Sequence, residues 1–146
     1  MNQDARRNLE DLLDREIEAA RLLSTTLAAE RSALTGTSPE DVQQKAAEKI
    51  QLLEMIERLE RERRAVCAES GLGDAPTVGG MVSERWRSLM ELMAGCRAAN
   101  EVNGYIIHVR QNQVRQLMEI LRGTTPVTYG PQGKTFARAL RALARA

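Results

Sequence analysis

The chain has 146 residues, the size of one domain, a formal net charge of +1 and only 3% aromatic residues. A near-zero net charge argues against a protein that finds its partner through bulk electrostatic attraction. One Trp, one Phe and two Tyr are too few rings to fill a globular core. The apolar mass is Leu, Ala, Met and Ile, which suits the narrow interfaces between packed helices.

The first predicted element is an amphipathic helix from about Asp4 to Leu34, a stretch that contains no Gly or Pro. Acidic residues crowd its early turns, where they favour the positive end of the helix dipole. Gly36 ends it. Its apolar residues recur mostly at three- and four-residue steps, the spacing of one helix face: Leu9, Leu12, Leu13, Ile17, Ala20, Leu23, Leu27 and Leu34.

A second helix is predicted to start immediately and to run to about Glu69. Ser38 is its predicted N-cap and Pro39 its first residue, with acidic residues following in the first turn. Because only a few residues separate the two helices, they should form an antiparallel hairpin. The apolar positions of this helix are Val42, Ala46, Ile50, Leu53, Ile56 and Leu59.

Gly71 to Gly80 form the main break in the chain, and a third helix is predicted from Ser83 to Arg122, with Gly123 as its stop. At ~1.5 Å per residue this helix is about 60 Å long. A helix of that length is stable in water only if a partner covers its apolar stripe. The stripe follows alternating steps of three and four, which is a heptad seam: Trp86, Leu89, Met93, Cys96, Asn100, Asn103, Ile107, Arg110, Val114, Leu117 and Leu121.

Asn100, Asn103 and Arg110 place polar groups in the middle of this seam. Polar seam residues cost stability, and they fix the register or mark a change of partner. Two interpretations stay open. In one, Asn100 and Asn103 form hydrogen bonds to a facing helix. In the other, the packed bundle ends near them and the rest of the helix faces something else.

These elements predict an all-α fold, with an antiparallel bundle of three long helices over residues 1–123 and a flexible C-terminal tail over residues 124–146. The tail begins with a Gly- and Pro-rich stretch, which excludes a helix there. Its last part is Ala- and Arg-rich and short for an isolated helix, so we expect it to be mobile when free and helical when docked. It carries four basic residues unopposed by any acid: Lys134, Arg138, Arg141 and Arg145.

The sequence contains no catalytic constellation, and we expect neither enzyme activity nor a cofactor. Glu and Asp mostly alternate with Lys and Arg along the helices, the pattern of a solvated helical surface. His108 has no acid or nucleophile placed beside it to make it a general base. Cys67 and Cys96 lack the spacing of metal ligands, which predicts two small buried or half-buried thiols and no metal site.

The polar start Met1-Asn2-Gln3-Asp4, and the lack of any run near the ~20 apolar residues of a membrane span, predict a cytoplasmic protein without membrane insertion. The basic tail leaves two weaker alternatives open, contact with nucleic acid or with a membrane surface. Nucleic acid is disfavoured because the body of the chain is acidic and carries no platform of aromatic rings.

Recognition of a helix or an extended segment of another protein is the function that these features favour. Exposed apolar residues late in the third helix would offer a surface for an amphipathic partner helix, and the adaptable side chain of Met118 suits such a surface. The alternative is that all of them belong to the intramolecular core. The predicted substrate-binding residues are Ile107, Val114, Leu117, Met118, Leu121, Phe136 and Leu140.

Two short motifs make the chain resemble a known family. Residues Asn100 to Ile107 read N-E-V-N-G-Y-I-I, and residues Tyr129 to Thr135 read Y-G-P-Q-G-K-T. With a Trp upstream, this order is similar to the FlgN family of flagellar export chaperones, and Lys49 and the pair Arg63-Arg64 also look similar. The motif residues are Trp86, Asn100, Asn103, Gly104 and Ile107.

The resemblance implies a cytoplasmic chaperone that binds the C-terminal helical segments of the hook-filament junction proteins FlgK and FlgL. Such a chaperone prevents their premature association and delivers them to the type III export gate. The resemblance also implies that Tyr129 and Gly130 dock to the gate protein FlhA. The rival interpretation, from another class, is a structural coiled-coil protein that homo-oligomerises, for instance as a homodimer.

Gly104 lies inside the predicted third helix. A glycine at such a position costs about 1 kcal/mol relative to Ala. It therefore suggests either the close approach of another backbone or a flexible point in the helix.

Overall fold

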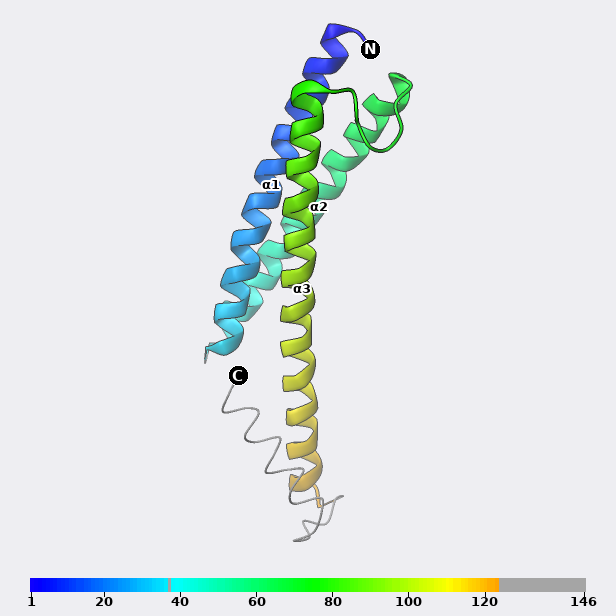
Figure 1. Ribbon diagram of the computed structural model, residues 1–146. Coiled ribbons are helices and arrows are strands. Elements are labelled where there is room, and N and C mark those ends of the chain that lie inside the picture. Colours follow the sequence, from blue (N-terminus) through cyan, green and yellow to red (C-terminus); the bar gives the residue numbers. More distant parts are fainter. Residues whose placement is uncertain (37, 124–146) are drawn as a thin grey trace. The chain divides into compact units, whose positions relative to one another are not determined.

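Three α-helices make up the described part of the computed structural model, which covers residues 1–36 and 38–123 (Figure 1). α1 is Gln3–Thr35, α2 is Pro39–Glu69 and α3 is Gly80–Leu121. The predicted all-α fold of three long helices is confirmed. The tail, residues 124–146, lies outside the described residues, so the domain boundary predicted at residue 123 stays a prediction.

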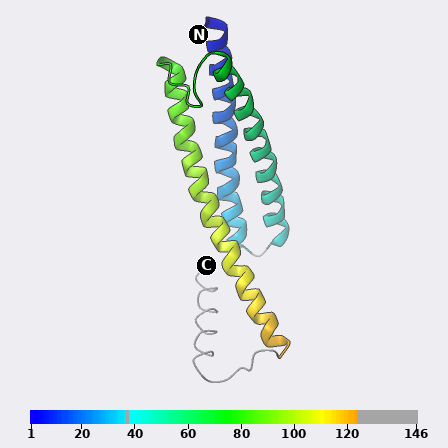
Figure 2. The ribbon, with the colours of Figure 1, turned by 90° about the vertical axis from the view of Figure 1, so that its right-hand side faces the viewer.

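The chain divides into two compact units, Met1–Glu101 and Val102–Ala146, and α3 continues from the first into the second. In the first unit the three helices lie side by side, and α2 runs antiparallel to α1 and to the beginning of α3 (Figures 1 and 2). The predicted antiparallel hairpin is therefore confirmed. In the second unit, the described element is the rest of α3.

Local sequence explains where α1 and α2 begin. The Asn2 side chain accepts a hydrogen bond of 2.7 Å from the backbone N–H of Ala5, which caps α1. The Ser38 hydroxyl accepts one of 3.4 Å from the N–H of Asp41, and Pro39 is the first residue of α2, as predicted. α1 thus starts one residue earlier than the sequence suggested, because the N-cap is Asn2.

The end of α2 is a Schellman turn, which stops the helix at the predicted residue. Gly71 has a φ of 71°, in the left-handed region that a residue with a Cβ rarely adopts. Its N–H donates to the carbonyl of Ala68, and the N–H of Leu72 donates to the carbonyl of Cys67 at 2.8 Å. Leu72 also packs against the core, so the chain leaves the helix in a fixed direction.

α3 begins at Gly80, three residues before the predicted start. Gly79 and Gly80 have φ values of 76° and 60°, so these glycines turn the chain directly into the helix. The N–H of Gly79 donates to the Ser83 hydroxyl at 2.9 Å, and its carbonyl accepts a hydrogen bond of 3.0 Å from the Arg6 guanidinium. These contacts hold the start of α3 beside the start of α1.

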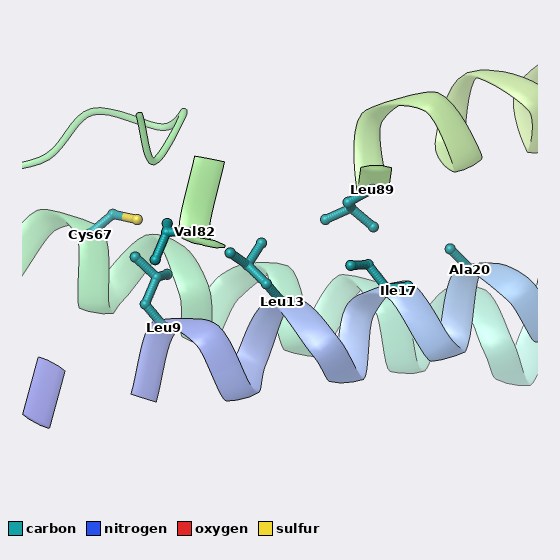
Figure 3. Packing of buried hydrophobic residues seen from close by; sticks show 7 residues of the cluster. All are labelled: Leu9, Leu13, Ile17, Ala20, Cys67, Val82 and Leu89. Atoms are coloured by element: carbon teal, nitrogen blue, oxygen red, sulfur yellow. The ribbon is translucent and has the colours of Figure 1, made fainter. Parts of the chain in front are cut away.

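The core of the first unit is built from small and medium apolar side chains, as the composition suggested. Two clusters follow α1. One joins it to Cys67 of α2 and to Val82 and Leu89 of α3, and the other joins it to α2 and to Cys96 of α3. Figure 3 shows the first cluster, with Val82 close to Leu9 and Cys67. Its members are Leu9, Leu13, Ile17, Ala20, Cys67, Val82 and Leu89.

Candidate partner-binding surface

The apolar seam of α3 is buried at its beginning and exposed at its end. In the first unit Leu89 and Cys96 are buried. In the second unit the exposed fractions are 59% for Val114, 37% for Leu117, 44% for Met118 and 81% for Leu121. Monomeric soluble proteins rarely leave a contiguous apolar patch of this kind uncovered, and such patches mark interaction sites. We call these four residues the α3 edge.

The other predicted substrate-binding residues fall into two groups. Ile107 is half-buried, so only part of its side chain is available to a partner. Phe136 and Leu140 lie outside the described residues, as do Tyr129 and Gly130 of the predicted gate-docking motif. Their roles therefore stay predictions.

The polar residues of the seam bear on both interpretations that the sequence left open. Asn100 accepts a hydrogen bond of 3.1 Å from the Lys49 ammonium, which confirms for this residue the predicted bond to a facing helix. Asn103 is fully buried although it is polar. The division of the chain falls between these two residues, after Glu101, so the packed three-helix unit also ends where the second interpretation placed it.

Lys49 connects all three helices of the first unit. Besides its bond to Asn100 of α3, its ammonium lies 2.9 Å from the carboxylate of Glu30 on α1. Glu30 is buried, and a buried carboxylate is costly unless it is paired and hydrogen-bonded. Lys49 thereby pairs with the buried charge of Glu30 and links α2 to both other helices. We call this contact the Lys49 clamp.

Arg63 makes a second connection of the same kind, the Arg63 clamp. Its Nε donates to Glu16 of α1 at 2.8 Å, and its Nη1 donates to the carbonyl of Asp74 in the α2–α3 loop at 3.0 Å. Its guanidinium also lies over the ring of Trp86 on α3, 4.6 Å from the centroid. Arg63 and Glu16 are both buried, so this ion pair belongs to the interior.

The sequence-based prediction that the acidic residues lie on a solvated surface is wrong for Glu16 and Glu30, both of which are buried. Their spacing contained the signal. On α1 one series of buried positions follows alternating steps of four and three. Positions 9, 13, 20, 23, 27 and 34 of this series are apolar, and Glu16 and Glu30 occupy the two positions that remain. A charged residue at a vacant heptad position indicates a buried ion pair.

Burial also changes the proton affinity of three groups. Burial raises the pKa of Glu16 above its ordinary value of 4.5, although the Arg63 guanidinium acts in the opposite direction. Burial likewise raises the pKa of the Cys67 and Cys96 thiols. Both cysteines are free and buried, as predicted.

Two of the five motif residues behind the family resemblance belong to the clamps. Trp86 stacks on Arg63, and Asn100 bonds to Lys49, so both contribute to helix packing. Gly104 is exposed, and a Cβ added to it would meet no heavy atom of the described residues within 4 Å. The described residues therefore bring no other backbone close to Gly104, and both explanations, close approach and a flexible point, stay predictions.

The described residues form neither a candidate metal site nor a candidate membrane span. Residues 1–36 and 38–123 contain no group of three or more His, Cys, Asp or Glu side chains that could hold a metal ion. The three described helices also include none that is long and apolar enough to cross a membrane.

Comparison with known proteins tests the family. The sequence profile described as FlgN protein matches residues 1–136. The chain belongs to the FlgN family. Two relatives, each named flagella synthesis protein FlgN, come from Salmonella typhimurium strain LT2 and Salmonella typhi. Each is 27% identical over 131 residues, which cover 87% of this chain and 89% of the relative. No solved structure gives a significant match.

The FlgN match spans both described units and extends into the tail. The α3 edge, the two clamps and the Tyr129 motif therefore all fall within the part of the chain that the family covers. Within that part, the α3 edge is a stripe of four apolar side chains that α3 leaves exposed.

Proposed function

We propose that this FlgN-family chain is a cytoplasmic export chaperone of flagellum assembly. It binds the C-terminal helical segments of hook-filament junction proteins of the FlgK and FlgL type, prevents their early association and delivers them to the export gate. The observation that carries the proposal is the α3 edge, where Val114, Leu117, Met118 and Leu121 are exposed on α3.

The edge suits a helical guest. Its residues recur at steps of three and four, so they form one stripe that an amphipathic helix covers through its own apolar face. Each large side chain that such a guest buries fully contributes about 1.5–3 kcal/mol, from which the ordering of the guest segment subtracts. The thioether of Met118 adjusts to side chains of different shape, which suits a carrier with more than one cargo.

Delivery requires a second contact. In the proposal, Tyr129 and Gly130 dock to the gate protein FlhA, while Phe136 and Leu140 extend the cargo surface beyond α3. This assignment rests on the family resemblance alone, because these residues lie outside the described part of the chain.

A pair of matched variants tests cargo binding. Leu117→Asp places a charge in the middle of the α3 edge, and Gln116→Asp adds the same charge at the neighbouring exposed position. Calorimetry with the C-terminal segment of FlgK or FlgL should show a loss of affinity of about 100-fold for Leu117→Asp, because its carboxylate would be buried without a partner. Gln116→Asp should bind as the unchanged protein does.

The result that contradicts the proposal is the absence of heat with either cargo for the unchanged protein, or equal effects of the two variants. Circular dichroism before each titration shows whether the variants keep their helices. Sedimentation over a concentration series tests the rival at the same time. Self-association that Leu117→Asp abolishes, together with no cargo binding, would favour the homo-oligomeric coiled coil.

A further inference from the structure

A groove between α2 and α3 runs along the first unit, apart from the α3 edge. One part encloses about 450 Å³ and is lined by both helices and by the loop at Asp74. The next part encloses about 210 Å³ and is lined by all three helices. Met93 and Arg97 line both parts, so the two hollows form one continuous groove.

Apolar side chains from α2 and from α3 line parts of this groove. Leu53 of α2 and Met90 of α3 line it and are exposed, and Met93 lies between the two parts. Leu53 occupies an apolar position at which the sequence predicted contact with a neighbouring helix, but α3 leaves it uncovered. On α2 the lining extends from Lys49 to Arg64, a distance of about 23 Å at 1.5 Å per residue. That length accommodates about four turns of a helix.

Most charged residues that line the groove are paired, and the exceptions among the described residues are Asp74 in the α2–α3 loop and Arg97 on α3. Arg63 pairs with Glu16, Arg64 pairs with Glu60 at 2.7 Å, and Lys49 pairs with Glu30. Arg97 is exposed and has no ion-pair partner among residues 1–36 and 38–123. The part of the groove beside Leu53 has no acidic residue in its lining. It therefore presents an apolar surface next to an uncompensated cation.

We propose that the α2–α3 groove is a second docking site, which takes an amphipathic helix of a protein partner with an acidic side chain placed beside Arg97. Such a helix would become a fourth member of the bundle, with its apolar face on Leu53, Met90 and Met93. The Arg97 pair selects the partner by charge, since an exposed ion pair adds specificity and little affinity.

Two synthetic peptides serve as probes. Each has 16 residues and the same Leu/Ala apolar face, and the polar positions carry Glu in one and Lys in the other. The one Trp of the chain, Trp86, lines the groove, so its fluorescence reports occupancy. The acidic peptide should bind about fivefold more tightly than the basic one at low salt. Arg97→Glu should reverse that preference, whereas Arg87→Glu, an equal charge change on exposed α3 surface outside the lining, should keep it.

A second pair of variants tests the apolar side chains that line the groove. Leu53→Asp should abolish peptide binding, whereas Leu22→Asp, at an exposed leucine of α1 that does not line the groove, should leave it unchanged. Binding of FlgK or FlgL should survive in both. Three results would overturn the proposal: no saturable change in Trp86 fluorescence with either peptide, equal effects of Arg97→Glu and Arg87→Glu, or joint loss of peptide and cargo in Leu53→Asp. Failure of cargo binding alone would concern the α3 edge and not the groove.

Discussion

The guanidinium of Arg63 lies between the carboxylate of Glu16 and the ring of Trp86, 2.8 Å from the first and 4.6 Å from the ring centroid of the second. One side chain of α2 thus contacts α1 and α3 together. Because the three groups come from different helices, their contact depends on the closed bundle and not on any single helix. The contacts of Arg63 therefore form only when the three helices of the first unit are packed together.

Removal of the Glu16 carboxylate should strongly destabilise the first unit. Glu16→Ala leaves the Arg63 charge buried without its partner, which costs about 3–5 kcal/mol. Glu18→Ala removes an exposed glutamate from the same helix, whose pair with Arg21 is solvated, and should change stability by less than about 0.5 kcal/mol. Urea denaturation followed by circular dichroism measures both, and similar small effects would show that the buried pair contributes little.

The raised pKa of Glu16 predicts a specific pH dependence. In the folded protein this carboxyl binds its proton more tightly than in the unfolded chain, whose pKa is close to 4.5. Its contribution to stability is therefore complete below pH 4.5 and is lost as the pH rises through the folded-state pKa. Between about pH 4 and pH 7, the unfolding free energy of Glu16→Gln should decrease less with rising pH than that of the unchanged protein. Parallel pH profiles would contradict this assignment.

Gly104 should lower the stability of α3 relative to alanine at the same position. Alanine at this exposed helical position should raise the unfolding free energy by about 0.5–1 kcal/mol, because glycine loses more backbone entropy on folding. Gly95→Ala is the matched control, since it also lies in α3 with no atom of the described residues near its missing Cβ. If Gly104 is a flexible point, Gly104→Ala alone should also weaken cargo binding. Equal cargo affinity for both variants would remove that explanation.

Tyr129 should act at the gate and not on the cargo. We expect Tyr129→Ala to weaken FlhA binding by about tenfold, the scale for loss of a buried aromatic anchor, with cargo affinity unchanged. Tyr105→Ala removes the other tyrosine of the chain, an exposed residue of α3, and controls for the loss of a ring. Equal loss of FlhA and cargo binding in Tyr129→Ala would argue against separate sites.

Helix positions could be predicted from the sequence because their signals are local. Ser38 and Pro39 define the start of α2, and Gly71 and Gly123 take the left-handed conformations that follow α2 and α3. The start of α3 differed because the contacts at Gly79 involve a side chain of α1, far away in sequence. The α3 edge was also predictable, since its apolar spacing continued beyond the polar Asn100 and Asn103.

The ion pairs of the two clamps were not predicted, because ion pairs between helices depend on how the helices are rotated against one another. In the sequence Glu16 and Glu30 look like ordinary surface acids. They differ only in that each occupies a position of the heptad series at which an apolar residue is expected. The exposure of Leu53 was missed for a related reason. Its apolar spacing indicated contact with a neighbour, but the spacing alone does not show whether that neighbour belongs to the same chain.

The pairing of α1 with α3 has a consequence for synthesis on the ribosome. Leu9 and Leu13 are covered by Val82 and Leu89, which are translated much later, after the Gly71–Gly80 loop. A nascent chain that has emerged only through α2 therefore presents these leucines to water until the first turns of α3 follow. During that interval the hairpin is the species most open to aggregation or to capture by folding factors.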